Sequence, residues 1–345
     1  MKHVLVTGSS GTIGTRLCER LLREGYHVTG VDRLPNRWNS QVDSLTIVGD
    51  LCHEETVGSL PDSPDAVVHL AANARVHNLV LDPLLACENV RSTFAALEFC
   101  RRNSIKRFLF ASSREVYGNV NGMKRCEDET HVDTCESPYT ASKFSGEALA
   151  SAYERCYGIR CIVTRFSNVY GMYDASDRLI PLFIKRARQN RDLVVYGPNK
   201  ILDFTHVDDT VEGIYRCIQR FDCLSEKTFN IATGRGTSIT AVAEMIKERV
   251  GSASPIVLRD NRAGEVVQFV ADVSAAREHL GYEPSVTIEE GLSKALAWYP
   301  CCEHSDCGLD KEPPTPIVAS GKTARLSHRE TLGYPPLKGH SGVTL

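Results

Sequence analysis

Short apolar runs alternate with amphipathic segments over the first half of the chain. Ile13, Leu17 and Leu21 recur at the i, i+4, i+8 spacing of one helix face. A longer predicted helix carries its apolar stripe at Leu84, Leu85, Val90, Phe94, Leu97 and Cys100.

Six apolar runs are predicted to be strands, and helical patterns lie between several of them. Strands that are apolar throughout and separated by helices are typical of a parallel sheet covered on both faces. The pattern therefore predicts an α/β fold with a Rossmann-type doubly wound parallel sheet. The predicted strands are His3–Thr7, His27–Val31, Leu45–Val48, Ala66–Leu70, Arg107–Ala111 and Arg160–Thr164.

The alternation of apolar runs and helical patterns becomes irregular after about Phe166, which indicates a smaller mixed α/β domain. We expect a dinucleotide-binding domain over 1–165, a substrate domain over 166–299 with some chain crossing back, and a poorly ordered tail over 300–345. The second region has helical patterns at Leu179–Asn190, Asp208–Arg220, Ser238–Val250 and Ile288–Trp298, and strands at Leu193–Tyr196 and Phe229–Ala232.

The composition agrees with a folded chain of about two domains. The sequence has 345 residues, of which 42% are hydrophobic and 24% charged. A formal charge of −3 excludes a global field that attracts nucleic acid or anionic lipid. The 13 cysteines are an odd number scattered through periodic segments, and we interpret them as thiols that fill the core at Cys18, Cys87, Cys100, Cys161 and Cys217.

The sequence also predicts a cytoplasmic protein with no membrane partner. No apolar run approaches the roughly 20 residues that span a bilayer. The segment from Met1 reaches Gly8 too soon to be the apolar core of a secretion signal.

A glycine-rich string follows the first predicted strand and leads directly into a helix. Gly8, Gly11 and Gly14 supply a tight turn, a close approach to a ligand and a helix-on-strand contact, with Thr12 and Ile13 between them. Free N–H groups and the helix dipole favour a pyrophosphate at this position. The strand before and the helix after are the context that a dinucleotide site requires.

Two carboxylates follow the next strands and extend this prediction. Asp32 lies roughly 20 residues beyond the glycines, where a carboxylate accepts the adenosine ribose hydroxyls and favours NAD over NADP. Arg33 beside it leaves some room for a 2′-phosphate. Asp50 and Leu51 are placed to reach the adenine ring, although an Asp in this position is often a helix cap.

The glycine spacing, together with a Tyr-x-x-x-Lys pair, resembles the short-chain dehydrogenase/reductase superfamily. Further motifs resemble its extended branch, the NAD-dependent sugar-nucleotide epimerases and dehydratases, over about residues 1–299. These motifs are Tyr139-Thr140-Ala141-Ser142-Lys143, His69-Leu70-Ala71-Ala72, Ser112-Ser113-Arg114-Glu115-Val116-Tyr117-Gly118, Arg165-Phe166-Ser167-Asn168-Val169-Tyr170-Gly171 and Arg262-Ala263-Gly264-Glu265. The resemblance adds Leu70, Ala71 and Ala72 to the expected cofactor-binding residues.

Tyr139 and Lys143 are one helical turn apart, so we expect the ammonium to lie beside the phenol and to favour its ionised form. A phenol with a pKa near 10 then becomes a usable base near neutrality. The resemblance implies that Lys143 also binds the nicotinamide ribose and that the Ser113 hydroxyl orients the substrate alcohol.

The resemblance also assigns substrate contacts. Asn168 and Arg262 match residues that bind the substrate diphosphate, a task that suits the planar arginine fork. Relatives carry an arginine where this chain has Leu202, and Lys200 is the candidate replacement. His206 is expected to be a structural histidine at a helix start.

Arg114 and Glu115 are the residues that distinguish the possible reactions from one another. In 4,6-dehydratase relatives this pair is Asp-Glu, the acid and base of water elimination, and a guanidinium does not donate a proton at neutral pH. We therefore expect C4 epimerisation of a UDP-hexose, or of a UDP-hexuronate if Arg114 pairs with a substrate carboxylate. A dehydratase or decarboxylase that uses Glu115 is the alternative, and a non-catalytic NAD sensor is a further one. The alternative without a function is that Arg114 points to solvent and that Glu115 makes a structural hydrogen bond.

Other partners follow from the resemblance and from composition. The family is commonly dimeric through the helix that bears Tyr139, so we expect a homodimer that binds a nucleotide sugar. Cys301, Cys302, His304 and Cys307 do not have the usual paired spacing of zinc ligands, and we expect no metal.

Overall fold

The computed structural model of the chain describes residues 2–119, 124–174 and 176–299. The predicted tail over 300–345 lies outside the described residues, and so do Cys301, Cys302, His304 and Cys307.

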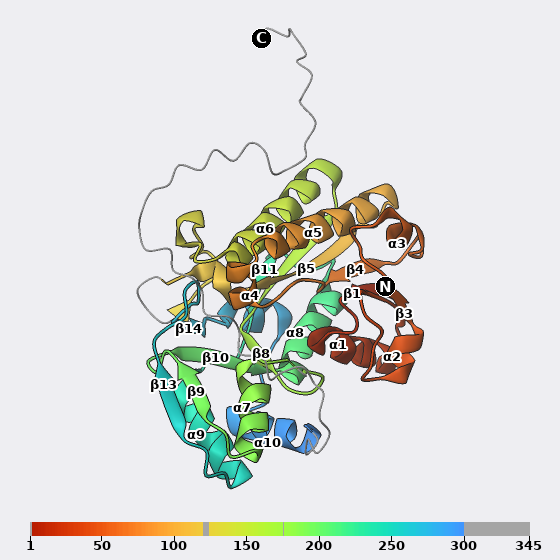
Figure 1. The fold of residues 1–345 in the computed structure, drawn as a ribbon. Helices are drawn as coiled ribbons and strands as arrows, with labels where there is room; N and C mark the ends of the chain where they lie inside the picture. Colours follow the sequence, from red (N-terminus) through yellow and green to blue (C-terminus); the bar gives the residue numbers. More distant parts are fainter. Residues whose placement is uncertain (1, 120–123, 175, 300–345) are drawn as a thin grey trace, which may run out of the picture. The chain divides into compact units, whose positions relative to one another are not determined.

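Within the described residues, a sheet of seven parallel strands forms the centre of the fold (Figure 1). The strand order reverses between β1 and β4, which confirms the predicted doubly wound sheet. Ligands bind such sheets at the carboxyl ends of the strands near this reversal. From one edge to the other the strands are β11 (Thr228–Ile231), β7 (Arg160–Phe166), β5 (Arg107–Ser113), β4 (Ala66–His69), β1 (His3–Thr7), β2 (His27–Asp32) and β3 (Thr46–Val48).

Helices cover both faces of this sheet. On one face α1 (Thr12–Arg23) and α8 (Val207–Arg220) share a hydrophobic core with the strands. On the other face α5 (Leu84–Arg102) and α6 (Pro138–Tyr157) do the same. The shorter helices α2 (Ser40–Ser44), α3 (Glu54–Gly58) and α4 (Val76–Leu81) lie in the connections.

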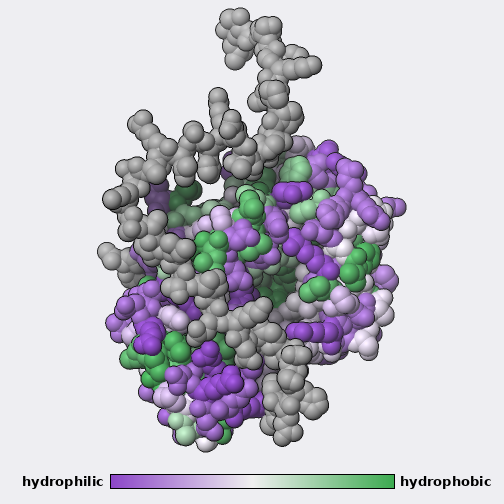
Figure 2. All heavy atoms as spheres, in the orientation of Figure 1, coloured by the Kyte–Doolittle hydropathy of each residue, from purple (hydrophilic) through white to green (hydrophobic). Residues whose placement is uncertain are grey.

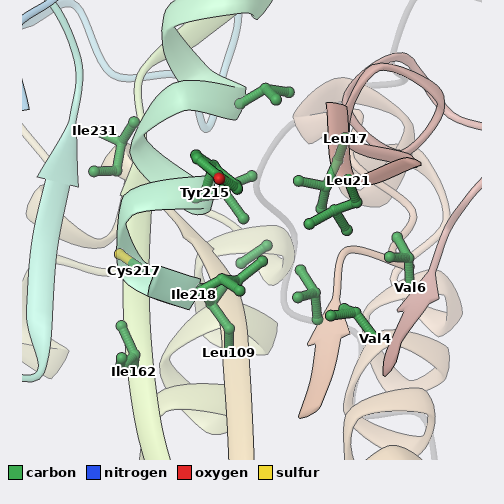
Figure 3. Close-up of a cluster of buried hydrophobic side chains, with 14 of the residues drawn as sticks. Val4, Val6, Leu17, Leu21, Leu109, Ile162, Tyr215, Cys217, Ile218 and Ile231 are labelled. Carbon is green, nitrogen blue, oxygen red and sulfur yellow. The ribbon is translucent and has the colours of Figure 1, made fainter. Parts of the chain in front are cut away.

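The contact between α1 and α8 shows how the apolar residues at helical spacing in α1 hold this helix layer on the sheet. Figure 3 shows Leu17 and Leu21 of α1 between the strand that carries Val6 and the α8 side chains Tyr215 and Ile218. Leu17 and Leu21 are fully buried. Burial of each such side chain contributes about 1.5–3 kcal/mol, so the apolar face of α1 fixes the helix on the sheet.

The predicted apolar stripe of α5 is wrong in part, because Leu84 and Phe94 are exposed. The buried face of α5 carries Leu97 and Cys100 as predicted, together with polar residues that bond to the sheet and to α6. Thr93 hydrogen-bonds His69, and Asn89 donates to Ser142. Helical spacing shows which residues share a face. It does not show whether an apolar residue is exposed to solvent or whether a polar residue is buried with a hydrogen-bond partner.

Cysteine burial agrees with the sequence at four of the five core positions. Cys18, Cys100, Cys161 and Cys217 are buried free thiols. Cys87 is exposed, so its assignment to the core is wrong. It lies on the outward face of α5, near the exposed Leu84.

The described part of the chain contains no helix long and apolar enough to cross a membrane. Figure 2 shows one face of the molecule, on which hydrophilic side chains predominate and hydrophobic ones form separate patches.

A second sheet lies below the first in Figure 1. Its strand β10 was not predicted because Asp203 and Thr205 interrupt the apolar run, although both are completely buried. The sheet contains β12 (Gly236–Ser238), β10 (Ile201–His206), β14 (Gln268–Ala271) and β6 (Lys124–Arg125), with β8 (Asn168–Tyr170) paired to β10. Beside it are β9 (Leu193–Tyr196), β13 (Ile256–Arg259), α7 (Leu179–Arg188), α9 (Ile239–Val250) and α10 (Ile288–Trp298).

The chain crosses between the two sheets several times. Strand β11 follows the second-sheet strands β8 and β10 in the sequence, yet it pairs with β7 at the edge of the first sheet. Strand β6 precedes β7 in the sequence and pairs with β14 in the second sheet. The two sheets are therefore not built from consecutive halves of the chain.

A buried ion pair joins the segments that cross between the two sheets. Arg165 at the end of β7 binds both carboxylate oxygens of Glu147 on α6, at 2.7 and 3.0 Å. Arg165 also donates to the hydroxyl of Tyr117 and to the carbonyl of Glu127, a segment that leads from β6. Its side chain is 5% exposed, so α6, β7 and the connection from β6 depend on the same guanidinium.

Replacement of Arg165 by Met is expected to lower the free energy of unfolding by about 3–5 kcal/mol, because it leaves the Glu147 carboxylate buried without its cation. Urea denaturation measures this change. Arg277→Met is the matched control, since Arg277 pairs with Glu283 at an exposed surface and a change below about 1 kcal/mol is expected there. Equal losses in both variants contradict the assignment.

Candidate active site

The glycine-rich loop turns at the carboxyl end of β1 and requires glycine at two positions. Gly8 has a φ of +73°, and a Cβ there stands 2.8 Å from the backbone nitrogen of Ala71. A Cβ on Gly14 stands 2.0 Å from the Gly8 carbonyl oxygen. The loop thus lies directly against Leu70 and Ala71 and against the first turn of α1.

Helix α1 begins at this loop without a side-chain cap. Its N-cap is Gly11, and no side chain accepts from its first amides. Ile13 packs against the core below, and Thr12 donates its hydroxyl to the Tyr173 carbonyl, 3.0 Å away. The uncapped N–H groups of this 12-residue helix fit a pyrophosphate.

Asp32 at the end of β2 faces the same loop. Its carboxylate accepts from the backbone N–H groups of Ser10 and Leu34, each at 3.0 Å. The Arg33 guanidinium is held by Asp50 at 3.0 Å and by Glu88 at 3.1 Å. Two carboxylates at Arg33 disfavour a 2′-phosphate, because they already neutralise the cation and add negative charge.

The structure places the other predicted cofactor residues around this edge. The Asp50 carboxylate accepts from the Cys52 N–H at 2.8 Å, besides its pair with Arg33. Leu51 is buried in the core. Leu70, Ala71 and Ala72 follow β4, where the Ala71 N–H donates to the Thr7 hydroxyl at 3.1 Å.

Helix α6 presents the Tyr-x-x-x-Lys pair to strand β5. Ser137 caps the helix, and Pro138 occupies the first turn. Gly146 permits the close packing of α6 on β5, since a Cβ there stands 2.2 Å from the Phe110 ring. Lys143 donates to the Ala111 carbonyl at 2.7 Å, and its ammonium lies 5.7 Å from the centre of the Tyr139 ring.

The predicted effect of Lys143 on Tyr139 is not the dominant one. Burial raises the pKa of the Tyr139 phenol, and Glu115 raises it further. A hydrogen bond with Ser113 and the charges of Arg178 and Arg114 lower that pKa. Ser113 therefore contacts the phenol. The Lys143 ammonium bonds to a carbonyl, and Ser113, Glu115, Arg178 and Arg114 are the main side-chain influences on the Tyr139 pKa.

Lys143 is itself perturbed. Burial lowers its pKa from 10.5 to about 8, and the nearby Glu147 carboxylate opposes this shift. The lysine charge is thus easily lost in the ligand-free protein.

Arg114 and Glu115 form a buried ion pair directly after Ser113. One nitrogen of Arg114 lies 2.8 Å from Glu115 Oε1, and the residues are 8% and 4% exposed. A solvent-facing Arg114 is therefore excluded. Burial raises the pKa of Glu115, and Arg114 opposes this shift. Arg114 Nη1 and Glu115 Oε2 are both buried and have no hydrogen-bond partner among the described residues.

The predicted substrate residues lie on the second sheet and its connections. Asn168 begins β8, and its Oδ1 has no partner among the described residues. The Arg262 guanidinium lies 3.9 Å from the centre of the Tyr196 ring. Lys200 is buried in an ion pair with Glu265. Leu202 is buried in the apolar core, so β10 presents no cation there.

The sequence analysis missed three contributors. His69 is completely buried, accepts or donates at Thr7 2.8 Å away, and has its pKa lowered to about 3 by burial and by Lys143. Arg178 acts electrostatically on Tyr139, and Arg75 lies near Arg178. Each arginine is the residue before a helix, a position where sequence reasoning looks for Ser, Thr or Asp. His206, by contrast, caps α8 as expected.

The chain is similar to known proteins over most of its length. The profile of the NAD dependent epimerase/dehydratase family matches residues 4–232. An uncharacterised UDP-glucose epimerase of Bacillus subtilis is 30% identical over 310 residues, which are 86% of this chain and 97% of that protein.

Solved structures of two reaction classes resemble it. UDP-glucose 4-epimerase of Thermotoga maritima, solved with UDP-glucose, has a TM-score of 0.78 at 31% identity, covering 86% of this chain and 98% of its own. A dTDP-glucose 4,6-dehydratase of Streptomyces venezuelae, solved with NAD, has a TM-score of 0.79 at 26% identity, covering 86% and 96%.

In the absence of dinucleotide, the stability of the wild-type protein relative to Lys143→Met is expected to rise by up to about 3 kcal/mol between pH 8 and pH 10.5. In this window the unfolded chain keeps the lysine proton and the folded chain has lost it, so deprotonation favours the fold. Urea denaturation at several pH values measures the difference. Lys227→Met, at a half-exposed pair with Glu154, controls for removal of a surface lysine. A difference that falls with pH contradicts the prediction.

Proposed function

Because the chain belongs to the NAD dependent epimerase/dehydratase family, we propose that it inverts C4 of a nucleotide-linked sugar, a UDP-hexose or UDP-hexuronate. The observation that carries this proposal is the buried pair of Arg114 and Glu115 beside the Ser113 and Tyr139 hydroxyls.

NAD is the cofactor, and the carboxyl edge of the first sheet has the features that it requires. The glycine loop packs directly against Leu70, Ala71 and the start of α1, and the first N–H groups of α1 have no side-chain cap, which suits a pyrophosphate there. In this proposal Asp32 binds the adenosine ribose and Lys143 the nicotinamide ribose. When bound, NAD accepts a hydride from the sugar carbon and returns it to the opposite face.

The protein's own part is to move one proton and to hold the sugar. The C4 hydroxyl gives its proton to the Tyr139 phenolate while the C4–H hydride leaves, so a 4-keto sugar forms. Ser113 hydrogen-bonds the same phenol and orients the alcohol. Burial raises the pKa of Tyr139 in the ligand-free protein, and the Ser113 hydrogen bond, Arg178 and Arg114 oppose this shift, so these three groups support the base form. Tyr139 then returns the proton after the ketone has turned.

Arg114 argues against the 4,6-elimination of related dehydratases. Elimination of water from C6 needs an acid at this position, and a guanidinium does not supply a proton near neutrality. The base for C5 is also engaged, because the Glu115 carboxylate is bound to Arg114 at 2.8 Å. Epimerisation needs neither group and is therefore favoured.

The unpartnered Nη1 of Arg114 extends the proposal to acidic sugars. Because this nitrogen is buried next to the catalytic hydroxyls, a carboxylate on C5 of the sugar has a donor there. A hexuronate that is oxidised at C4 also loses carbon dioxide readily, so decarboxylation is the second candidate function.

The protein loaded with NAD is expected to convert one of four sugars, UDP-glucose, UDP-galactose, UDP-glucuronate or UDP-galacturonate, to a product of unchanged mass. In D₂O the product should contain no deuterium at carbon, because the hydride returns directly. Mass spectrometry and NMR test this. Loss of water or carbon dioxide, or deuterium at C5, favours the lyase alternatives.

In the same assay Tyr139→Phe should lower the rate by about 10²–10⁴-fold while NAD binding and thermal stability stay unchanged. Tyr157→Phe, an exposed tyrosine on the same helix, is the matched control. Normal turnover by Tyr139→Phe assigns the base to another residue.

NAD is expected to bind at least about tenfold more tightly than NADP, since Asp32 and the carboxylates around Arg33 repel a 2′-phosphate. Calorimetry with the stripped protein measures both affinities. Asp32→Asn should reduce the preference, whereas Asp43→Asn, on the nearby helix α2, should leave it unchanged. A preference for NADP in the wild type refutes the role of Asp32.

A further inference from the structure

Tyr173 has an unusual backbone conformation close to the glycine-rich loop. It lies in the segment of residues 171–174 that follows β8, and its φ is +66°. A bulky side chain is uncommon in this left-handed region, and the conformation persists only where the surroundings fix it. Firm contacts with the rest of the chain are therefore expected at this residue, and the structure contains them on two sides.

On one side Tyr173 is bound to helix α1. Its carbonyl accepts from the Thr12 hydroxyl at 3.0 Å, and its own hydroxyl donates to a Glu19 carboxylate oxygen at 2.6 Å. Burial and the hydrogen bond to Glu19 raise the pKa of the Tyr173 phenol to about 12, so the hydroxyl remains a donor at neutral pH. Thr12 begins α1 and Glu19 lies two turns later, so these bonds hold the tyrosine along the first half of the helix.

On the other side the Tyr173 ring packs on both tryptophans of the sequence. Its centre lies 6.2 Å from the ring centre of Trp38 and 5.5 Å from that of Trp298, and the two indole rings are 5.4 Å apart. Aromatic rings at these separations attract one another. Trp38 directly precedes the N-cap of α2, and Trp298 is the last residue of α10. The tyrosine thus joins α1 to two segments that are distant in the sequence.

The segment that carries Trp38 also contacts the glycine loop. The side-chain amide of Asn36 donates to the Ser9 carbonyl at 3.1 Å. The side-chain amide of Asn39 donates at 2.8 Å to the same Glu19 oxygen that accepts from the tyrosine. The glycine loop and the start of α1 are therefore tied to the tyrosine and to the two tryptophans.

These contacts concern NAD because they reach the groups that are expected to bind its pyrophosphate. The first N–H groups of α1 have no side-chain cap. Such groups bind an anion best when their positions are fixed before it arrives. Differences in affinity at one site arise mainly in the dissociation rate. A looser first turn of α1 should therefore lead to faster loss of the dinucleotide.

We propose that Tyr173 is a positioning residue for NAD, which fixes the first turns of α1 through Thr12 and Glu19 and so slows release of the dinucleotide. Trp38 and Trp298 support this role by packing on the Tyr173 ring. Because Trp298 ends α10, the last described helix contributes to the retention of a cofactor that binds at the first. The inference is independent of which sugar reaction the protein performs.

The test loads the stripped protein with NADH, mixes it with excess NAD and follows release by the fluorescence of NADH. Tyr173→Asn should speed release by about tenfold or more, because asparagine adopts the left-handed conformation but lacks the ring and the phenol. Tyr173→Phe, which removes the hydroxyl and keeps the ring, should speed release by a smaller factor. Tyr157→Asn and Tyr157→Phe, at an exposed tyrosine of α6, are the matched controls and should release NADH at the wild-type rate.

Trp298→Leu tests whether this tryptophan acts through the tyrosine. Alone, the substitution should also speed release of NADH. Added to Tyr173→Asn, it should speed release further by less than about twofold, since the contact that it removes is already lost. Independent effects that multiply in the double variant overturn the role of Trp298.

Thermal unfolding of the same variants separates positioning from support of the fold. A merely structural Tyr173 loses thermal stability on substitution without a change in the release of NADH, and that result overturns the proposal. Wild-type release from both Tyr173 variants overturns it as well, and so does equal acceleration in the Tyr157 controls. If Tyr173→Asn does not fold, Tyr173→Phe decides, because it changes one hydroxyl.

Discussion

The close packing of helix α6 on strand β5 is the contact on which the site and the join between the sheets depend. One face of α6 carries Tyr139, Lys143, Gly146 and Glu147, which recur at the spacing of helical turns. Because Gly146 has no side chain, the Phe110 ring fits against the helix. This approach brings Lys143 to a carbonyl of β5 and, one turn later, Glu147 to the arginine at the end of β7.

Burial has opposite consequences for the charges around this helix. Where a partner is present, as in the pair of Glu147 and Arg165, the low-dielectric surroundings make the pair a firm link between elements. Where a partner is weak, as for Lys143, burial shifts the pKa toward the neutral form. Burial likewise lowers the pKa of Arg75, and the charges of Arg178 and Arg262 add to this shift while Asp174 opposes it.

The fold itself does not decide between epimerisation and elimination. Structures of both classes resemble the described chain to nearly the same degree. In the proposed mechanism both reactions begin with oxidation of the sugar at C4, so they make the same demands on the architecture. In our proposal the distinction lies in the two residues after Ser113, where Arg114 holds the carboxylate of Glu115.

The sequence by itself determined the doubly wound sheet, its glycine loop and the order of its motifs, because apolar strands and helix periodicity are local patterns. It also predicted Ser113, Tyr139 and Lys143 as site residues, whose spacing follows from one strand end and one helical turn. The tertiary structure alone decided which polar groups are inside. Strand β10 escaped detection because Asp203 and Thr205 are buried among distant partners, and the exposed Phe94 looked like core. The pKa of Tyr139, the pair of Lys200 with Glu265 and the meeting of Arg75 with Arg178 all depend on residues far apart in the chain. Burial and electrostatic coupling are properties of distances in space, and these are set only when the sheets and helices pack.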